Sequence, residues 1–126
     1  MNLVTQIAAV FMGVSLVVVF VLESFFYRRP ALHPIFLIEP GQEATVRLWV
    51  VNQGFYNFCF GVAALAGVAL AGVGEEAVGT SLVVFTSASM VVSGTVLYVT
   101  ERRLWRSSIA QALPPAVALV ALAVAG

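Results

Sequence analysis

Residues 3–27 form the apolar run LVTQIAAVFMGVSLVVVFVLESFFY, which determines the class of protein. A helix of this length, at about 1.5 Å per residue, is longer than the ~30 Å hydrocarbon core of a bilayer. The run contains one carboxylate, Glu23, and it ends at Arg28-Arg29-Pro30, where charge and a helix-breaking residue coincide. No basic segment precedes it, so we expect a retained transmembrane span and not a cleaved secretory signal.

The composition of the whole chain agrees with this interpretation. Of its 126 residues, 61% are hydrophobic and 10% are charged, whereas an ordinary soluble domain has about 25% charged residues. The charges are six arginines and six glutamates, so the formal net charge is zero. A chain without a basic excess is a poor candidate for nucleic-acid binding, and its single cysteine, Cys59, excludes an intrachain disulfide and a cysteine-based zinc motif. We interpret Cys59 as a small core residue.

Three further apolar segments predict an all-α integral membrane bundle of four helices in one domain, residues 1–126. The predicted spans are residues 3–27, 44–72, 78–100 and 108–125. Pro40 precedes the second span, where Glu43 and Arg47 have the spacing of a favourable helical ion pair. The third is rich in hydroxyl groups that can bond to their own helix or to a neighbour. Pro114-Pro115 interrupts the fourth, so we expect a kinked crossing, with a re-entrant or interfacial segment as the alternative.

The arginines predict the orientation of the chain in the membrane. Five of them follow the first span or the third, whereas the amino terminus, the Glu75-Glu76 turn and the carboxyl tail have none. The positive-inside rule then places these two loops in the cytoplasm and both termini outside. The predicted location is the cytoplasmic membrane, crossed several times.

Polar side chains inside apolar spans are energetically costly unless they face protein or water, so each indicates a packing or binding role. The predicted orientation of the chain places several of these polar side chains at a similar depth near the cytoplasmic side. We therefore predict one polar cluster to which all four helices contribute. Its candidate ligand-binding residues are Glu23, Asn52, Gln53, Tyr56, Asn57, Tyr98 and Gln111, and candidate charge partners of Glu23 are Arg47, Arg102 and Arg103. The alternative is that these amides and tyrosines only join helices, at about 0.6 kcal/mol each.

Other residues indicate packing more than chemistry. Small residues recur on the second span at Ala63, Gly67 and Ala71, and on the third at Thr80, Ser87 and Gly94, as close helix packing requires. Trp49, Trp105 and Tyr27 lie where an interfacial aromatic belt is expected. His33 has no second histidine or cysteine near it, so we interpret it as a solvated interfacial residue and predict no metal site. Self-association through the small residues is a lesser alternative.

Three motifs in order resemble the domain of unknown function 1304 family of small bacterial membrane proteins. They are Leu22-Glu23-Ser24-Phe25, the run of residues 52–57 (NQGFYN), and Arg102-Arg103 followed by Gln111-Ala112-Leu113-Pro114. The resemblance covers nearly the whole chain and implies fold and location, not activity. Members of that family usually have a Glu-His pair two turns before the glutamate of the first span. Here those positions are Ser15 and Leu16, so the resemblance does not imply haem or metal ligation in this chain.

Three functions remain compatible with these residues. The first is binding of a small uncharged or cationic molecule, or a lipid or quinone headgroup, by the polar cluster in the cytoplasmic leaflet. The second is a structural or accessory membrane subunit without a ligand, and the third is a small proton-coupled exporter, because such exporters are also short chains with one glutamate in the first span. We do not expect an enzyme or a cofactor, because the spans contain no histidine, no Ser-His or Cys-His arrangement and no phosphate-binding glycine loop. The expected partners are the lipid bilayer and a small molecule or lipid.

Overall fold

The computed structural model describes residues 1–125, and these fold into four long helices with short helical turns between them. The long helices are α1 (Leu3–Phe25), α3 (Glu43–Gly72), α4 (Glu76–Thr100) and α5 (Trp105–Ala125). The connection from α1 to α3 contains the 3-10 turn η1 (Pro30–Leu32) and the short helix α2 (His33–Phe36), and a 3-10 turn η2 (Arg102–Leu104) precedes α5. All four long helices are long and apolar enough to cross a membrane. The all-α class and the four helices predicted from the sequence are therefore confirmed.

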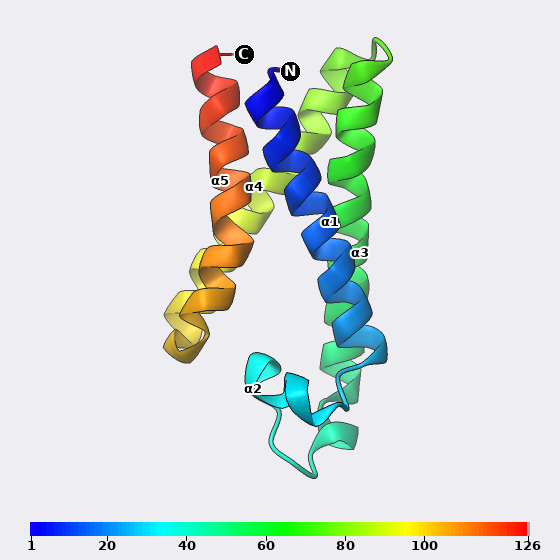
Figure 1. Cartoon of the computed structure of the whole chain (residues 1–126), viewed down its shortest axis with the longest axis vertical. Coiled ribbons are helices and arrows are strands. Elements are labelled where there is room, and N and C mark those ends of the chain that lie inside the picture. Colours follow the sequence, from blue (N-terminus) through cyan, green and yellow to red (C-terminus); the bar gives the residue numbers. More distant parts are fainter. Residues whose placement is uncertain (126) are drawn as a thin grey trace.

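The helices form two antiparallel pairs, α1 with α3 and α4 with α5 (Figure 1). Both chain ends lie at one end of the molecule, and there the two pairs are held together. At that end the Asn2 amide donates to the carbonyl oxygen of Ala121 over 2.9 Å, and the Met1 amino group contacts a carboxylate oxygen of Glu76. Toward the opposite end the pairs separate, and α2 lies below the space between them (Figure 1).

Glycines allow the two helices of the first pair to approach closely. A Cβ atom on Gly61 of α3 would lie 2.8 Å from the carbonyl oxygen of Gly13 on α1 and 3.1 Å from the Val17 side chain. Seven residues earlier on α3, Gly54 faces the backbone oxygen of Phe20 and the Ser24 side chain. Backbones that meet this closely gain packing energy, which is the main driving force for helix association in lipid.

Small residues also make the contacts of α3 with α4 and of α4 with α5. Gly67 of α3 faces the backbone of Gly79 on α4, and a Cβ atom on Gly94 of α4 would lie 2.8 Å from the Cβ atom of Ala112 on α5. Ser87, between these two contacts, is completely buried. The buried residues of both small-residue rows thus serve contacts within the bundle, whereas Ala63, Ala71 and Thr80 are only partly buried.

The apolar core lies near the middle of the bundle and is small. It contains Met12, Leu16, Ala64 and Met90, with Phe60 packed against it. By contrast, large apolar side chains on every long helix point outward; examples are Phe11, Phe85, Val92, Leu113 and Val124. An outer surface of this kind is compatible with contact to lipid and not with exposure to water. Leu16, one of the two positions where the resemblance leads us to expect a Glu-His pair, is a core residue.

The hydroxyl groups of α4 have two different environments. Those of Ser81, Ser89 and Thr95 donate to the backbone oxygen four residues earlier on their own helix, at 2.7–2.8 Å, as the sequence predicted. Thr86 and Ser87 are completely buried, and their hydroxyl oxygens have no hydrogen-bond partner among residues 1–125. Both therefore act mainly as slim side chains at the helix contact.

Three predictions about single residues were wrong. Cys59 is exposed on the outer face of α3 and is not in the core. His33 is buried because the loop folds back under the helices, and Tyr27, expected in the interfacial belt, is 4% exposed. Trp49 and Trp105 do lie exposed near the end of the molecule where the arginines are found.

Candidate functional site

The candidate site is a buried carboxylate and amide that face each other across the first helix pair. The amide nitrogen of Asn57 on α3 donates to the carboxylate of Glu23 on α1, with 2.5 Å between Nδ2 and Oε1. Glu23 is 9% exposed and Asn57 is 7% exposed. Ionisable groups in such surroundings need a partner that offsets their desolvation, and the structure gives Glu23 an amide in that role.

Gly54 explains why these two side chains meet. It lies on α3 one turn before Asn57, and a Cβ atom there would be 3.3 Å from the Cβ atom of Glu23 and would collide with the hydroxyl group of Ser24. The missing side chain lets α1 pack directly on α3, and Ser24 then donates a hydrogen bond to the backbone oxygen of Val51 over 3.2 Å. The NQGFYN run thus supplies both the close approach and the amide.

The predicted charge partners do not pair with Glu23. Among residues 1–125, no arginine lies within ion-pair distance of its carboxylate. Arg103 pairs with Glu101 at 2.8 Å, and the guanidinium group of Arg102 lies 5.6 Å from the centre of the Tyr98 ring. Arg47 is exposed in the first turns of α3, so its charge lies outside the bundle.

The other polar residues of the α3 run point away from this contact. Asn52, Gln53 and Tyr56 are exposed, and the Asn52 amide donates to the Leu48 carbonyl of its own helix over 2.7 Å. Gln53 was expected in the same polar cluster as Asn57. It is not part of this contact, because α1 covers only the narrow face of α3 that carries Gly54 and Asn57.

The expected convergence of all four helices is also absent from the contacts of the described residues. Tyr98 on α4 is 43% exposed beneath Arg102, and Gln111 on α5 is partly buried. No hydrogen bond within residues 1–125 joins either of them to Glu23 or Asn57. The physical reason is that the α4–α5 pair separates from the α1–α3 pair toward this end of the molecule (Figure 1).

Two buried polar side chains that follow Glu23 in the sequence were not among the predicted site residues. Tyr27 lies two residues after α1 ends, and its hydroxyl has no hydrogen-bond partner within residues 1–125. The Nε2 atom of His33, at the start of α2, lies 3.4 Å from a carboxylate oxygen of Glu43. The ion pair predicted between Glu43 and Arg47 does not occur within residues 1–125. The three prolines in residues 30–40 were the available signal for a folded loop.

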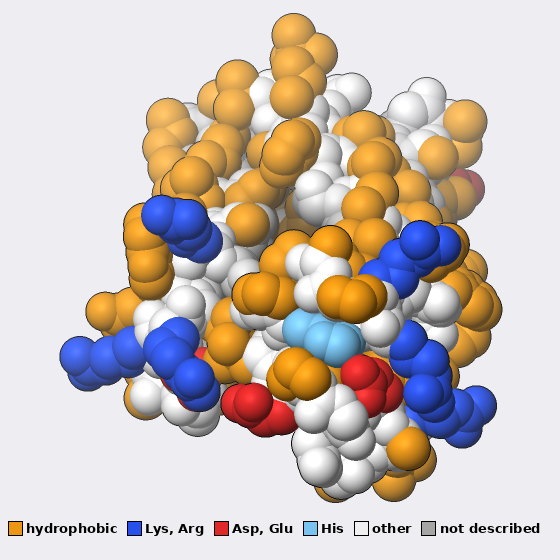
Figure 2. All heavy atoms as spheres, turned by 60° about the horizontal axis from the view of Figure 1, so that its bottom comes forward, with side chains coloured by type: hydrophobic (Ala, Val, Ile, Leu, Met, Phe, Trp, Pro, Cys, Tyr) orange, Lys and Arg blue, Asp and Glu red, His pale blue; other side chains and the backbone are white. Residues whose placement is uncertain are grey.

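This loop and the turn before α5 form the arginine-rich end of the molecule. Figure 2 shows basic side chains spread around this end, with acidic side chains among them. A cavity of about 380 Å³ lies between residues of the loop, including His33 and Pro34, and Arg103 of the turn. At the turn, hydrogen bonds from the Arg103 side chain and backbone lower the pKa of the Glu101 carboxyl to about 2. No group of three metal-ligating side chains occurs within residues 1–125.

Comparison with known proteins identifies the family but not the activity. No curated protein and no solved structure matches the chain. Residues 10–123 match the family described as "Protein of unknown function (DUF1304)". This match includes most of α1, all of α3, the turn with Glu101, and nearly all of α5. The chain therefore belongs to the DUF1304 family.

Proposed function

We propose that this protein is a multi-pass protein of the cytoplasmic membrane that binds a small cationic or hydrogen-bond-donating molecule at Glu23 and Asn57. The observation that carries the proposal is a buried carboxylate whose hydrogen-bond partner is an amide and which has no arginine beside it within residues 1–125. A carboxylate in this position either keeps a proton or binds a cation or donor. Either state makes it suitable for reversible binding.

The orientation supports access from the cytoplasm. All six arginines lie toward the end opposite the chain termini: four lie between the long helices, and Arg47 and Arg106 lie in the first turns of α3 and α5. The positive-inside rule then assigns this end to the cytoplasm and both termini to the outside. Glu23 lies in the last turn of α1 at that end, so a ligand would enter from the cytoplasmic leaflet, where the two helix pairs separate.

A second candidate function is a structural or accessory subunit without a ligand. The observation that favours it is the position of the Glu23–Asn57 hydrogen bond in the α1–α3 contact, beside Gly54 and the Ser24 hydrogen bond. In that case the hydrogen bond only fixes how the two helices align. The two candidates differ in what happens when the carboxylate is replaced.

Glu23→Gln distinguishes them, because it keeps the shape and the hydrogen-bonding capacity but removes the titratable group. If the carboxylate is a binding site, the variant should be as stable in mild detergent as the original protein, and small molecules that co-purify with it should be lost. If the charge-assisted hydrogen bond between Glu23 and Asn57 is needed to hold α1 on α3, its replacement by a neutral hydrogen bond should reduce stability by about 1–2 kcal/mol.

Ser24→Ala is the matched control. Ser24 lies in the same helix contact, but its hydrogen bond goes to the backbone oxygen of Val51 and not to the carboxylate. We expect a small loss of stability and unchanged co-purifying molecules, which native mass spectrometry would identify. A marked drop in melting temperature for Glu23→Gln with the same molecules still bound would refute the binding proposal.

A further inference from the structure

A second feature, separate from Glu23, is a groove of about 500 Å³ between the lower halves of α4 and α5. Most of its lining is apolar or small. The lining residues are Gly94, Thr95, Tyr98, Trp105, Ser108, Ile109 and Ala112. Such a volume lies within the range of small-molecule sites in proteins, about 300–1,000 Å³. Tyr98, Trp105 and Ile109 are roughly half exposed, so the groove opens on the outer surface of the bundle, where lipid is in contact with the helices.

One polar group lines this groove without a partner. Ser108 is 4% exposed, and its hydroxyl oxygen has no hydrogen-bond partner among residues 1–125. A buried hydroxyl without a partner costs free energy, and most such groups in proteins do bond to something. A ligand in the groove with an oxygen atom at this depth would satisfy it.

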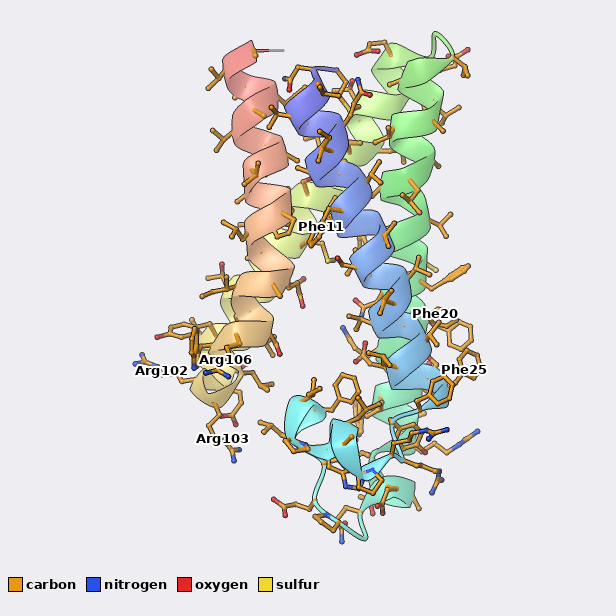
Figure 3. All side chains as sticks on the ribbon, viewed as in Figure 1. Phe11, Phe20, Phe25, Arg102, Arg103 and Arg106 are labelled. Atoms are coloured by element: carbon orange, nitrogen blue, oxygen red, sulfur yellow. The ribbon has the colours of Figure 1, made fainter. Side chains whose placement is uncertain are left out.

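Two arginines lie over the aromatic rings at the mouth of the groove. The guanidinium carbon of Arg102 is 5.6 Å from the centre of the Tyr98 ring, and that of Arg106 is 5.1 Å from the centre of the Trp105 ring. Figure 3 shows both at the arginine-rich end of the α4–α5 pair. Within residues 1–125 neither forms an ion pair, whereas Arg103 between them pairs with Glu101.

The chemistry at the mouth is that of a phosphate site. Guanidinium groups bind phosphate oxygens in a bidentate geometry, and an aromatic ring beneath each one fixes its plane. Arg102 and Arg106 are also at the level where helices α4 and α5 leave the apolar layer, which is the depth of lipid phosphates. A basic pocket between transmembrane helices at this depth is typical of anionic lipid sites.

We propose that this groove binds one anionic phospholipid, with its phosphate at Arg102 and Arg106 and one acyl chain along the lining residues. The Ser108 hydroxyl donates to an ester oxygen of the same lipid. A zwitterionic lipid of equal chain length fits the apolar part but carries its own cation beside the phosphate. The protein therefore prefers the anionic lipid.

The test compares phosphatidylglycerol with phosphatidylcholine of identical acyl chains, each added to the full-length protein in a mild non-ionic detergent. Binding is measured by native mass spectrometry and by the rise in melting temperature. Phosphatidylglycerol should bind more tightly and raise the melting temperature more. In Arg102→Gln/Arg106→Gln its apparent affinity should fall on the order of 10- to 30-fold, and the preference over phosphatidylcholine should disappear.

The chain offers a matched control. Arg28 and Arg29 lie at the same end of the molecule and over the rings of Tyr27 and Phe26, but they do not line the groove. Arg28→Gln/Arg29→Gln removes the same charge and should keep the lipid preference. An equal loss in both double variants would overturn the proposal, because it would show general attraction by a basic surface.

Two further arms test the groove itself. Thr95→Trp fills the groove from an exposed position and should abolish binding of phosphatidylglycerol even though both arginines remain. Unchanged binding in this variant would overturn the proposal. Inorganic phosphate at the same concentration should not raise the melting temperature, and a rise equal to that given by the lipid would show a free-anion site instead.

Discussion

Gly67→Ala is the substitution whose effect on stability follows most directly from the helix contacts. Gly67 lies on α3 where this helix meets α4. A Cβ atom at this position would be 2.8 Å from the backbone oxygen of Gly79 and 2.9 Å from a methyl carbon of Val83. Both distances are shorter than ordinary carbon contacts, and the first involves backbone, so α3 and α4 must move apart.

Two opposing terms give the magnitude. Overpacking of a close contact costs about 1–3 kcal/mol, and replacement of glycine by alanine inside a helix gains up to about 1 kcal/mol. Gly72→Ala is the control, because it is the same change on the same helix and a Cβ atom there would have no neighbour within 4 Å. Gly72 is the last residue of α3, so its gain is smaller. The two gains cancel only in part, so we expect Gly67→Ala to be less stable than Gly72→Ala by about 1–2 kcal/mol.

The assay is unfolding of the purified protein in mild detergent, by titration with sodium dodecyl sulfate and detection of helix content by circular dichroism. Gly67→Ala should unfold at a lower fraction of the denaturing detergent than the original protein, and Gly72→Ala at an equal or higher fraction. If the two variants unfolded together, the α3–α4 contact would not limit stability, and the role assigned to Gly67 would be refuted.

Three further predictions test orientation, surface and charge. Reporter fusions should place residues 28–42 and 101–107 in the cytoplasm and both termini outside, and a cytoplasmic carboxyl terminus would mean that the last segment does not cross. Cys59, on the outer face of α3, should resist a charged maleimide in intact vesicles but react after the protein is unfolded, because thiolate formation requires water; rapid labelling in vesicles would contradict a lipid-facing position. Because the pKa of Glu101 is lowered to about 2 from 4.5, its pairing with Arg103 should stabilise the fold above pH 4.5 and lose this effect as the pH falls toward 2. The stability difference between the original protein and Glu101→Gln should therefore shrink over this range, and a difference independent of pH would exclude that pairing.

The amino-acid sequence by itself determined the number of long helices and their approximate bounds. In lipid every backbone polar group must be bonded within the segment, so an apolar run of about 20 residues is nearly always a helix. It also determined the family, because the motifs around Glu23 and Asn57 and the turn before Gln111 occur together in the matched region. Small residues likewise indicated where helices meet, as Gly67 and Gly94 do.

Only the tertiary structure decided which polar residues meet. Lipid is as apolar as the interior of the bundle, so the pattern of apolar residues does not distinguish a buried helix face from a lipid-facing one. Gln53 and Asn57 are four residues apart, so the helical repeat places them on the same side of α3. However, α1 covers only Asn57. The separation of the α4–α5 pair takes Tyr98 and Gln111 out of the predicted cluster, and the folded loop buries His33. These outcomes depend on close backbone contacts between helices far apart in the chain, and such contacts are set by three-dimensional packing and not by local sequence.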